Sequence, residues 1–115
     1  MNLLVKPLTG ILGLVLTVAG VAGFFVSGSL LGFEVNTTHN IIHLLSGLVA
    51  LWAFNTSQSY SRIYLIVFGL VYGLVTVLGF MGGDILGLFT VNAADSYLHL
   101  AIAAACLIVG FGSRD

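Results

Sequence analysis

Charged residues are scarce in this chain. Of its 115 residues, only 6% are charged and 59% are hydrophobic, and the mean hydropathy is +1.17. Soluble domains carry about 25% charged residues, so this composition excludes an ordinary water-soluble protein. The formal charge of −1 gives no electrostatic basis for nucleic-acid binding. The single cysteine, Cys106, excludes an intrachain disulfide and a paired-cysteine site.

Acidic residues are also missing from the middle of every long apolar run. The charged residues that bound these runs are Lys6, Glu34, Arg62, Asp84, Asp95 and Arg114. Each of the four runs comes close to or exceeds the roughly 20 residues that a helix needs to cross a bilayer. A proton or ion path would use an acid within the membrane, and every acid here lies at a predicted surface. For catalysis, the sequence has no catalytic triad spacing, no carboxylate pair within a span and no phosphate-binding loop. We therefore expect a protein that is not an enzyme.

The apolar runs predict four helices with short connections. The expected ranges are about 7–26, 36–54, 60–81 and 92–112. Pro7 is expected in the first turn of the first helix, where its missing N–H costs nothing. The expected N-caps are Asn36, Ser59 and Asn92. Asp95, three residues after Asn92, predicts a capping box, and the apolar connection over residues 27–34 is expected at the bilayer interface.

The sequence repeats itself at a spacing of 56 residues. An ungapped alignment of residues 10–54 with residues 66–110 has 13 identities in 45 pairs, where composition would give roughly four. Each unit holds two helices, so the units run parallel and an axis along the membrane normal relates them. We predict an all-α membrane protein with a single domain over residues 1–115. It would be a four-transmembrane-helix bundle of two parallel helix-hairpin repeats (about 7–58 and 59–115) with pseudo-two-fold symmetry.

The charges also predict a topology. One predicted side, which holds both termini, carries Lys6, Arg62 and Arg114. The opposite side carries Glu34, Asp84 and Asp95. The positive-inside rule then places both termini in the cytoplasm. The segments that begin at Asn36 and Asn92 are expected near the outer face, which would be periplasmic, extracellular or lumenal.

Two matching polar stripes are the candidate site. On a helical wheel, one stripe holds Asn36, Asn40, His43 and Gly47, and the other holds Asn92, Ser96, His99 and Ala103. Polar groups in hydrocarbon are expected to face the bundle interior. Each histidine follows its cap by seven residues, about 10 Å along the helix, so His43 and His99 should converge at matched depth. The predicted structural polar motif is Asn36, Asn40, His43, Asn92, Asp95, Ser96 and His99.

Three interpretations of the histidines are open. In the first, no cofactor is bound, and His43 and His99 hydrogen-bond to carbonyls or to Asn40 and Ser96. In the second, His43 and His99 ligate haem iron, a chlorophyll-type magnesium or a transition metal. In the third, His39 and His43 bind zinc together with Glu34 or Asp95. We assign no metal site, because we expect His39 to be a solvated residue of the first helical turn.

The doubled motif resembles a known family. Its first copy is Leu31–Asn36 followed by His39-Asn40 and His43-Leu44, and its second is Leu86–Asn92 followed by Asp95-Ser96 and His99-Leu100. This pattern, with the segment Tyr72–Phe80, resembles the bacterial four-transmembrane-helix family called domain of unknown function 4383. Glu34 and Thr90 depart from the pattern, since many members have proline there. The resemblance implies the fold but no activity.

The expected role is that of a small integral membrane protein acting through helix packing. Its partners would be the lipid bilayer and either further copies of itself, as a homo-oligomer, or a larger membrane complex of which it is an accessory subunit. No nucleic-acid partner is expected. The alternative is a cofactor-binding membrane protein that uses His43 and His99.

Overall fold

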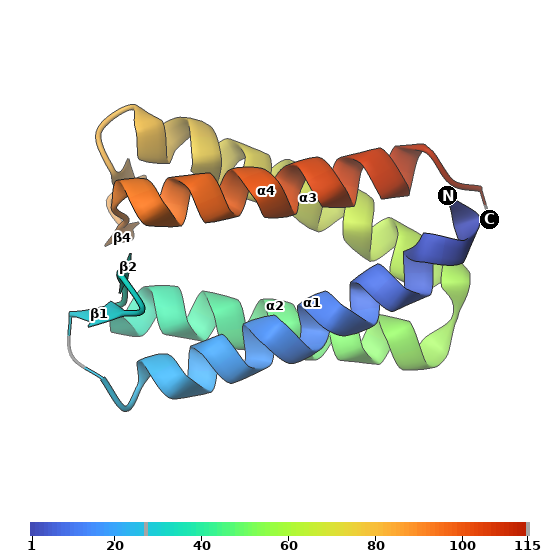
Figure 1. The fold of residues 1–115 in the computed structure, drawn as a ribbon, viewed down its shortest axis with the longest axis horizontal. Coiled ribbons are helices and arrows are strands. Elements are labelled where there is room, and N and C mark those ends of the chain that lie inside the picture. The colour runs from blue at the N-terminus through green and yellow to red at the C-terminus, as the bar shows by residue number, and fades with distance from the viewer. Residues whose placement is uncertain (27, 115) are drawn as a thin grey trace.

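The computed structural model describes residues 1–26 and 28–114. This part of the chain forms four long helices: α1 (Asn2–Gly23), α2 (Thr37–Thr56), α3 (Gln58–Phe80) and α4 (Ala93–Phe111). Strands β1 (Ser29–Leu30) and β2 (Phe33–Glu34) form an antiparallel hairpin before α2, and β3 (Asp84–Ile85) and β4 (Phe89–Thr90) form another before α4. Helix α1 packs on α2 and α3 on α4, and the two helical pairs lie side by side (Figure 1).

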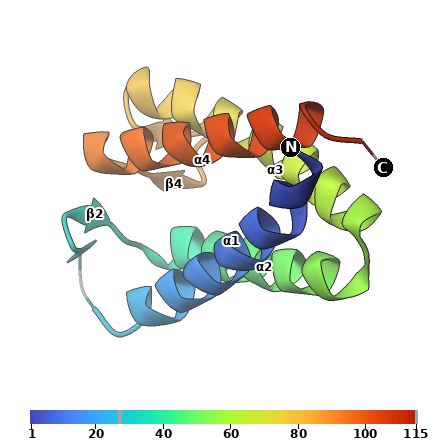
Figure 2. The same cartoon turned by 45° about the vertical axis from the view of Figure 1, so that its right-hand side comes forward.

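The two ends of the bundle differ. Both termini and the connection between α2 and α3 lie at one end, and both β-hairpins lie at the other (Figures 1 and 2). At the terminal end, Arg62 Nε donates to the Ser113 carbonyl at 3.2 Å, and the Arg114 N–H donates to Asn2 Oδ1 at 2.7 Å. The longest dimension is 39 Å, which exceeds the roughly 30 Å of a hydrocarbon core.

The distribution of side chains suits lipid as the solvent. Large apolar side chains cover the outside of the helices, with Leu3 at 91%, Leu14 at 61% and Leu74 at 54% exposure. Polar side chains are hidden inside, among them Thr9, His39, Asn40, Ser46, Ser61, Thr76, Asp95, Ser96 and His99. Among the described residues, α1, α3 and α4 are long and apolar enough to cross a membrane. Helix α2 is long enough but less apolar, because its first turns carry polar residues.

The N-cap predictions for α2 and α4 are confirmed. The Asn36 side chain accepts from the His39 N–H, and the Asn92 side chain accepts from the Asp95 N–H. Asp95 in turn accepts from the Asn92 N–H, which completes the predicted capping box.

Two predicted helix starts are wrong. Helix α1 begins at Asn2, because Val5 is fully buried in the core and packing extends the helix. Pro7 therefore lies inside the helix, where its missing N–H leaves one carbonyl without an intrahelical partner. Ser57, not Ser59, caps α3, and its hydroxyl accepts from the Tyr60 N–H at 3.1 Å. The turn between α2 and α3 is thus shorter than expected.

The fold is mostly helical rather than wholly helical. The two apolar connections form β-hairpins because backbone groups in apolar surroundings must find partners. Residues Leu31-Gly32 and Leu86-Gly87 turn the chain with positive φ at all four positions. These turns are 55 residues apart, whereas the caps Asn36 and Asn92 are 56 apart. The second hairpin therefore holds one additional residue, Leu88, between its strands.

Candidate functional site: a buried histidine cluster

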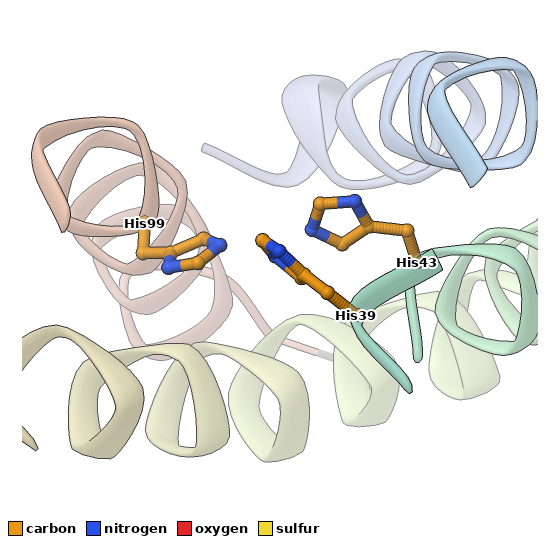
Figure 3. Close-up of side chains that lie close together, drawn as sticks. All are labelled: His39, His43 and His99. Atoms are coloured by element: carbon orange, nitrogen blue, oxygen red, sulfur yellow. The ribbon is translucent and has the colours of Figure 1, made fainter. Parts of the chain in front are cut away.

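All three histidines of the chain meet near the hairpin end of the bundle. His39 and His43 lie one turn apart on α2, and His99 projects toward them from α4 (Figure 3). One ring nitrogen from each histidine can be chosen so that all three lie within 4.8 Å of one another. Two helices that are distant in sequence thus converge on one point.

The rings are packed against each other and against two aromatic neighbours. The His39 centroid lies 4.1 Å from that of His43 and 5.4 Å from that of His99, and the His43 and His99 centroids are 5.9 Å apart. The three centroids therefore form a triangle, and Figure 3 shows the three rings gathered together. Phe89 of β4 stacks on His39 at 5.0 Å, and Tyr72 of α3 lies 5.5 Å from His99. Aromatic side chains from α3 and β4 therefore pack against the cluster.

The cluster holds ring nitrogens without hydrogen-bond partners. Within the described part of the chain, no hydrogen-bond partner is present for His39 Nε2, His43 Nε2 or either ring nitrogen of His99. His39 Nδ1 lies 3.2 Å from the Glu34 carbonyl oxygen. Since that oxygen can only accept, Nδ1 carries the proton, and Nε2 of the neutral ring keeps its lone pair. A ligating histidine is commonly oriented in this way, with its second nitrogen bonded to a carbonyl.

Glu34 links the cluster to a buried carboxylate. Asp95, which is 1% exposed, accepts through Oδ2 from the Glu34 N–H at 3.1 Å and from the Asn92 N–H at 3.0 Å. The backbone of Glu34 therefore bonds to Asp95 through its N–H and to His39 through its C=O. This shared residue places the Asp95 carboxylate close to the histidine cluster.

The two capping asparagines also lock the hairpins together. Asn36 Nδ2 donates to the Thr90 carbonyl at 3.1 Å, and Asn92 Nδ2 donates to the Gly32 carbonyl at 3.0 Å. The Thr90 hydroxyl donates to Glu34 Oε2 at 2.7 Å. Each asparagine therefore starts its own helix with its oxygen and holds the opposite hairpin with its nitrogen.

Sequence reasoning was right about two histidines and wrong about the third. His43 and His99 converge as predicted, but His39 is 2% exposed and belongs to the cluster instead of the solvent. Its signal was present in the sequence, since His39, His43 and Ser46 recur at helical spacing on one face. The sequence nevertheless favoured an exposed His39, because residues in the first turn of a helix are usually solvated.

The predicted stripe contained two residues that face elsewhere. A Cβ built on Gly23 of α1 would collide with the Asn40 side chain, and one built on Gly79 of α3 would collide with Ser96 Oγ. Asn40 and Ser96 therefore fill the contact between the helices of each pair. No hydrogen bond joins either of them to a histidine among the described residues, so the expected local partners of His43 and His99 are not observed.

An apolar cavity of about 200 Å³ adjoins the cluster. Its walls come from α2, α3, the β3–β4 hairpin and, through His99, α4. They include Ile42, Val75, Ile85 and Phe89. Its surface is almost wholly apolar, although the three histidines, Ser46 and Tyr72 are among its lining residues. The cluster thus lies between the hydrogen bonds that join the two hairpins and the apolar cavity.

These features define a membrane-type helical bundle with a buried histidine cluster. The chain belongs to the family described as a domain of unknown function (DUF4383), whose family model matches residues 6–112. A search of curated proteins and a search of solved structures found no match to the chain.

Proposed function

We propose that the chain is a membrane metal-binding protein in which His39, His43 and His99 bind one divalent first-row transition ion, with Zn²⁺ as the reference case. The observation that carries this proposal is the convergence of three histidines with unpartnered ring nitrogens. A buried polar group without a hydrogen bond costs about 1–3 kcal/mol. Coordination would satisfy one nitrogen of each ring, and imidazole suits zinc, copper, iron and nickel.

The spacing is compatible with a single ion. Tetrahedral zinc with Zn–N distances of about 2.0–2.1 Å has nitrogens about 3.4 Å apart. The nitrogens here lie within 4.8 Å of one another, so they would draw closer by side-chain rotation to ligate one ion. The adjacent Asp95 carboxylate would offset part of the cost of placing a cation among neutral ligands in an apolar region.

The same geometry disfavours haem or a chlorophyll-type pigment. A haem held by two axial histidines needs its macrocycle between them. The His39 ring packs against both His43 and His99, with centroids 4.1 Å and 5.4 Å away, and so crowds the space beside that gap. The cavity of about 200 Å³ is also below the roughly 300–1,000 Å³ of typical ligand pockets. An ion fits where a large ring does not.

We also propose the topology and the repeat. The supporting observations are that both termini lie at one end and that matched pairs recur 56 residues apart, such as Asn36 with Asn92 and Gly23 with Gly79. In this arrangement the four helices span the bilayer in two parallel repeats, with both termini cytoplasmic and the metal site near the outer face. A cysteine introduced at Ser59 should react with an impermeant maleimide only from the cytoplasmic side.

In its wider role, we propose that the protein is a non-enzymatic accessory or homo-oligomeric module. The connections are short, and the exposed helix faces are apolar. Gentle purification from native membranes, followed by native mass spectrometry, should find a defined oligomer or a partner. A lone monomer at native abundance would refute this role.

The metal proposal is tested with the purified protein in detergent. Co²⁺ should bind with one ion per chain and produce the visible bands of a low-coordinate site, and Zn²⁺ should displace it. Alanine at His39, His43 or His99 should each weaken binding by more than about 100-fold, beyond the roughly 10–100-fold that follows loss of an outer-shell partner.

Tyr72→Phe and Ser46→Ala are the matched controls, because both residues line the same cavity and neither supplies one of the clustered nitrogens. Both controls should bind Co²⁺ like the natural protein. Circular dichroism should show helix content unchanged in all variants. Substoichiometric binding by the natural protein, or full binding by the three alanine variants, would refute the proposal.

A further inference from the structure

The cavity beside the histidines opens toward the lipid-facing surface. Its rim is formed by Val71, Leu74, Leu86 and Leu88, which are 47%, 54%, 69% and 64% exposed. Its inner lining includes the histidines, with Phe89 stacked on His39. A molecule dissolved in the bilayer would therefore reach the cluster without passing the hydrogen-bonded hairpins.

The opening is one-sided. The corresponding groove on the other helical pair is lined by Leu14, Val15, Val18, Ala19, Ala22, Leu30 and Leu31. Five of these residues lie 56 positions before residues of the first cavity, for example Val15 before Val71 and Ala19 before Val75. No histidine lines this second groove. Where α2 carries His39, α4 carries Asp95, which the capping box holds. Access to the cluster is thus a property of one half of the bundle.

Three protein ligands leave a metal ion with an open position. Structural zinc sites have four protein ligands, whereas sites with three keep a position for water or another ligand. A buried water needs about two to four polar partners, and the cavity walls are almost wholly apolar. An apolar cavity of about 150 Å³ is large enough to hold benzene. The cavity here, of about 200 Å³, has room for one ring with a small substituent.

We infer that the cavity admits a neutral, lipid-soluble molecule of about one aromatic ring, carrying a single nitrogen donor, to the open position of the metal held by His39, His43 and His99. This inference rests on the proposed metal site. It adds the class of ligand and its direction of approach, which is from the bilayer between α2, α3 and the β3–β4 hairpin.

The test uses the Co²⁺-loaded protein and two probes. The first probe, 4-methylpyridine, is neutral, has one nitrogen donor and matches the cavity in size. The second, azide, is a small anionic donor that enters from water. 4-Methylpyridine should shift the visible Co²⁺ bands saturably, and azide should need at least about tenfold higher concentration, because an anion is costly to transfer into apolar walls.

A pair of matched variants locates the effect. Val75→Phe fills the cavity, and Ala19→Phe places the same ring at the corresponding position of the groove without histidine. Both variants keep the three histidines and should bind one Co²⁺. Val75→Phe should weaken 4-methylpyridine by about tenfold or more, since the ring loses its apolar contacts. Ala19→Phe should leave its affinity unchanged in the same detergent.

The outcomes separate the two proposals. If the natural protein binds no Co²⁺, the metal proposal fails and this inference fails with it. If Co²⁺ binds but 4-methylpyridine causes no saturable shift, or azide binds equally well, the metal site stands and lipid-side access is refuted. Equal weakening by Val75→Phe and Ala19→Phe would also refute it.

Discussion

Gly20 of α1 sets how closely the first helical pair packs, and its replacement is the most informative test of the fold. A Cβ at this position would lie 2.7 Å from the backbone nitrogen of Leu44 and 2.9 Å from the Asn40 carbonyl oxygen. Ordinary contact begins at 3.4 Å, so the helices must separate locally by about 0.7 Å to accept alanine at van der Waals distance. Since the obstructing atoms belong to the backbone of α2, no rotamer change relieves the clash.

The expected cost follows from two opposing terms. Because the clash is with backbone atoms, we expect the upper part of the overpacking range, about 2–3 kcal/mol. The higher helix propensity of alanine returns about 1 kcal/mol. Gly20→Ala should therefore lower the free energy of unfolding by about 1–2 kcal/mol, a factor of roughly 5–30 in the unfolding equilibrium. Because Leu44 follows His43 directly, the same displacement should weaken Co²⁺ binding.

Gly73→Ala on α3 is the control. Its added Cβ meets only the Ala103 methyl, at 4.0 Å, so stability should stay the same or rise by up to about 1 kcal/mol. The assay is unfolding with a denaturing detergent, followed by far-ultraviolet circular dichroism and by the fluorescence of Trp52, the single tryptophan. The packing argument is refuted if Gly20→Ala matches the natural protein, or if Gly73→Ala is destabilised to the same extent.

Two further predictions concern the hairpin end. Asn36→Ala removes both the cap for α2 and the bond to the Thr90 carbonyl, and should lower the free energy of unfolding by about 1.5–3 kcal/mol. Asn36→Ser keeps a cap oxygen but cannot reach Thr90, so it should lower the free energy of unfolding by about 0.5–1.5 kcal/mol. No loss for Asn36→Ser in the same unfolding assay would show that the bond to the opposite hairpin contributes nothing, and equal losses for the two variants would show that the cap contributes nothing. Leu31→Gly should stabilise the protein by about 0.5–1 kcal/mol, because Leu31 has φ of 53° and is 90% exposed, and glycine avoids the left-handed penalty. Leu30→Gly in strand β1, outside the positive-φ turn, should instead destabilise it in urea or detergent titrations.

Local features of the sequence determined much of the architecture. The long apolar runs fix the helices, since backbone hydrogen bonding in an apolar solvent leaves few alternatives. Asn36, Asn92 and Asp95 fixed two helix starts, because capping depends on residues within one turn. The spacing of His43 and His99 from these caps predicted that they would lie at matched depth, and the structure brings them together.

Features that depend on packing could not be found from local patterns. The burial of Val5 extends α1 past Pro7, against the local preference of proline for the first turn. The hairpins form because the connections must pair their own backbone groups beside the bundle. Asn40 and Ser96 share a helical stripe with His43 and His99 but face the partner helix of their own pair, a choice that a wheel with a broad polar face does not resolve.

The histidine cluster shows the same division most clearly. The sequence alone placed two histidines at one depth, because residues per turn and rise per residue are fixed properties of an α-helix. Only the tertiary structure placed the His39 ring against both of them. The rotation of α2 about its own axis, set by the contacts of Gly20 and Gly23 of α1 with that helix, directs His39 and His43 together toward α4 and the apolar cavity. That rotation depends on contacts between helices, which no stretch of sequence within α2 specifies.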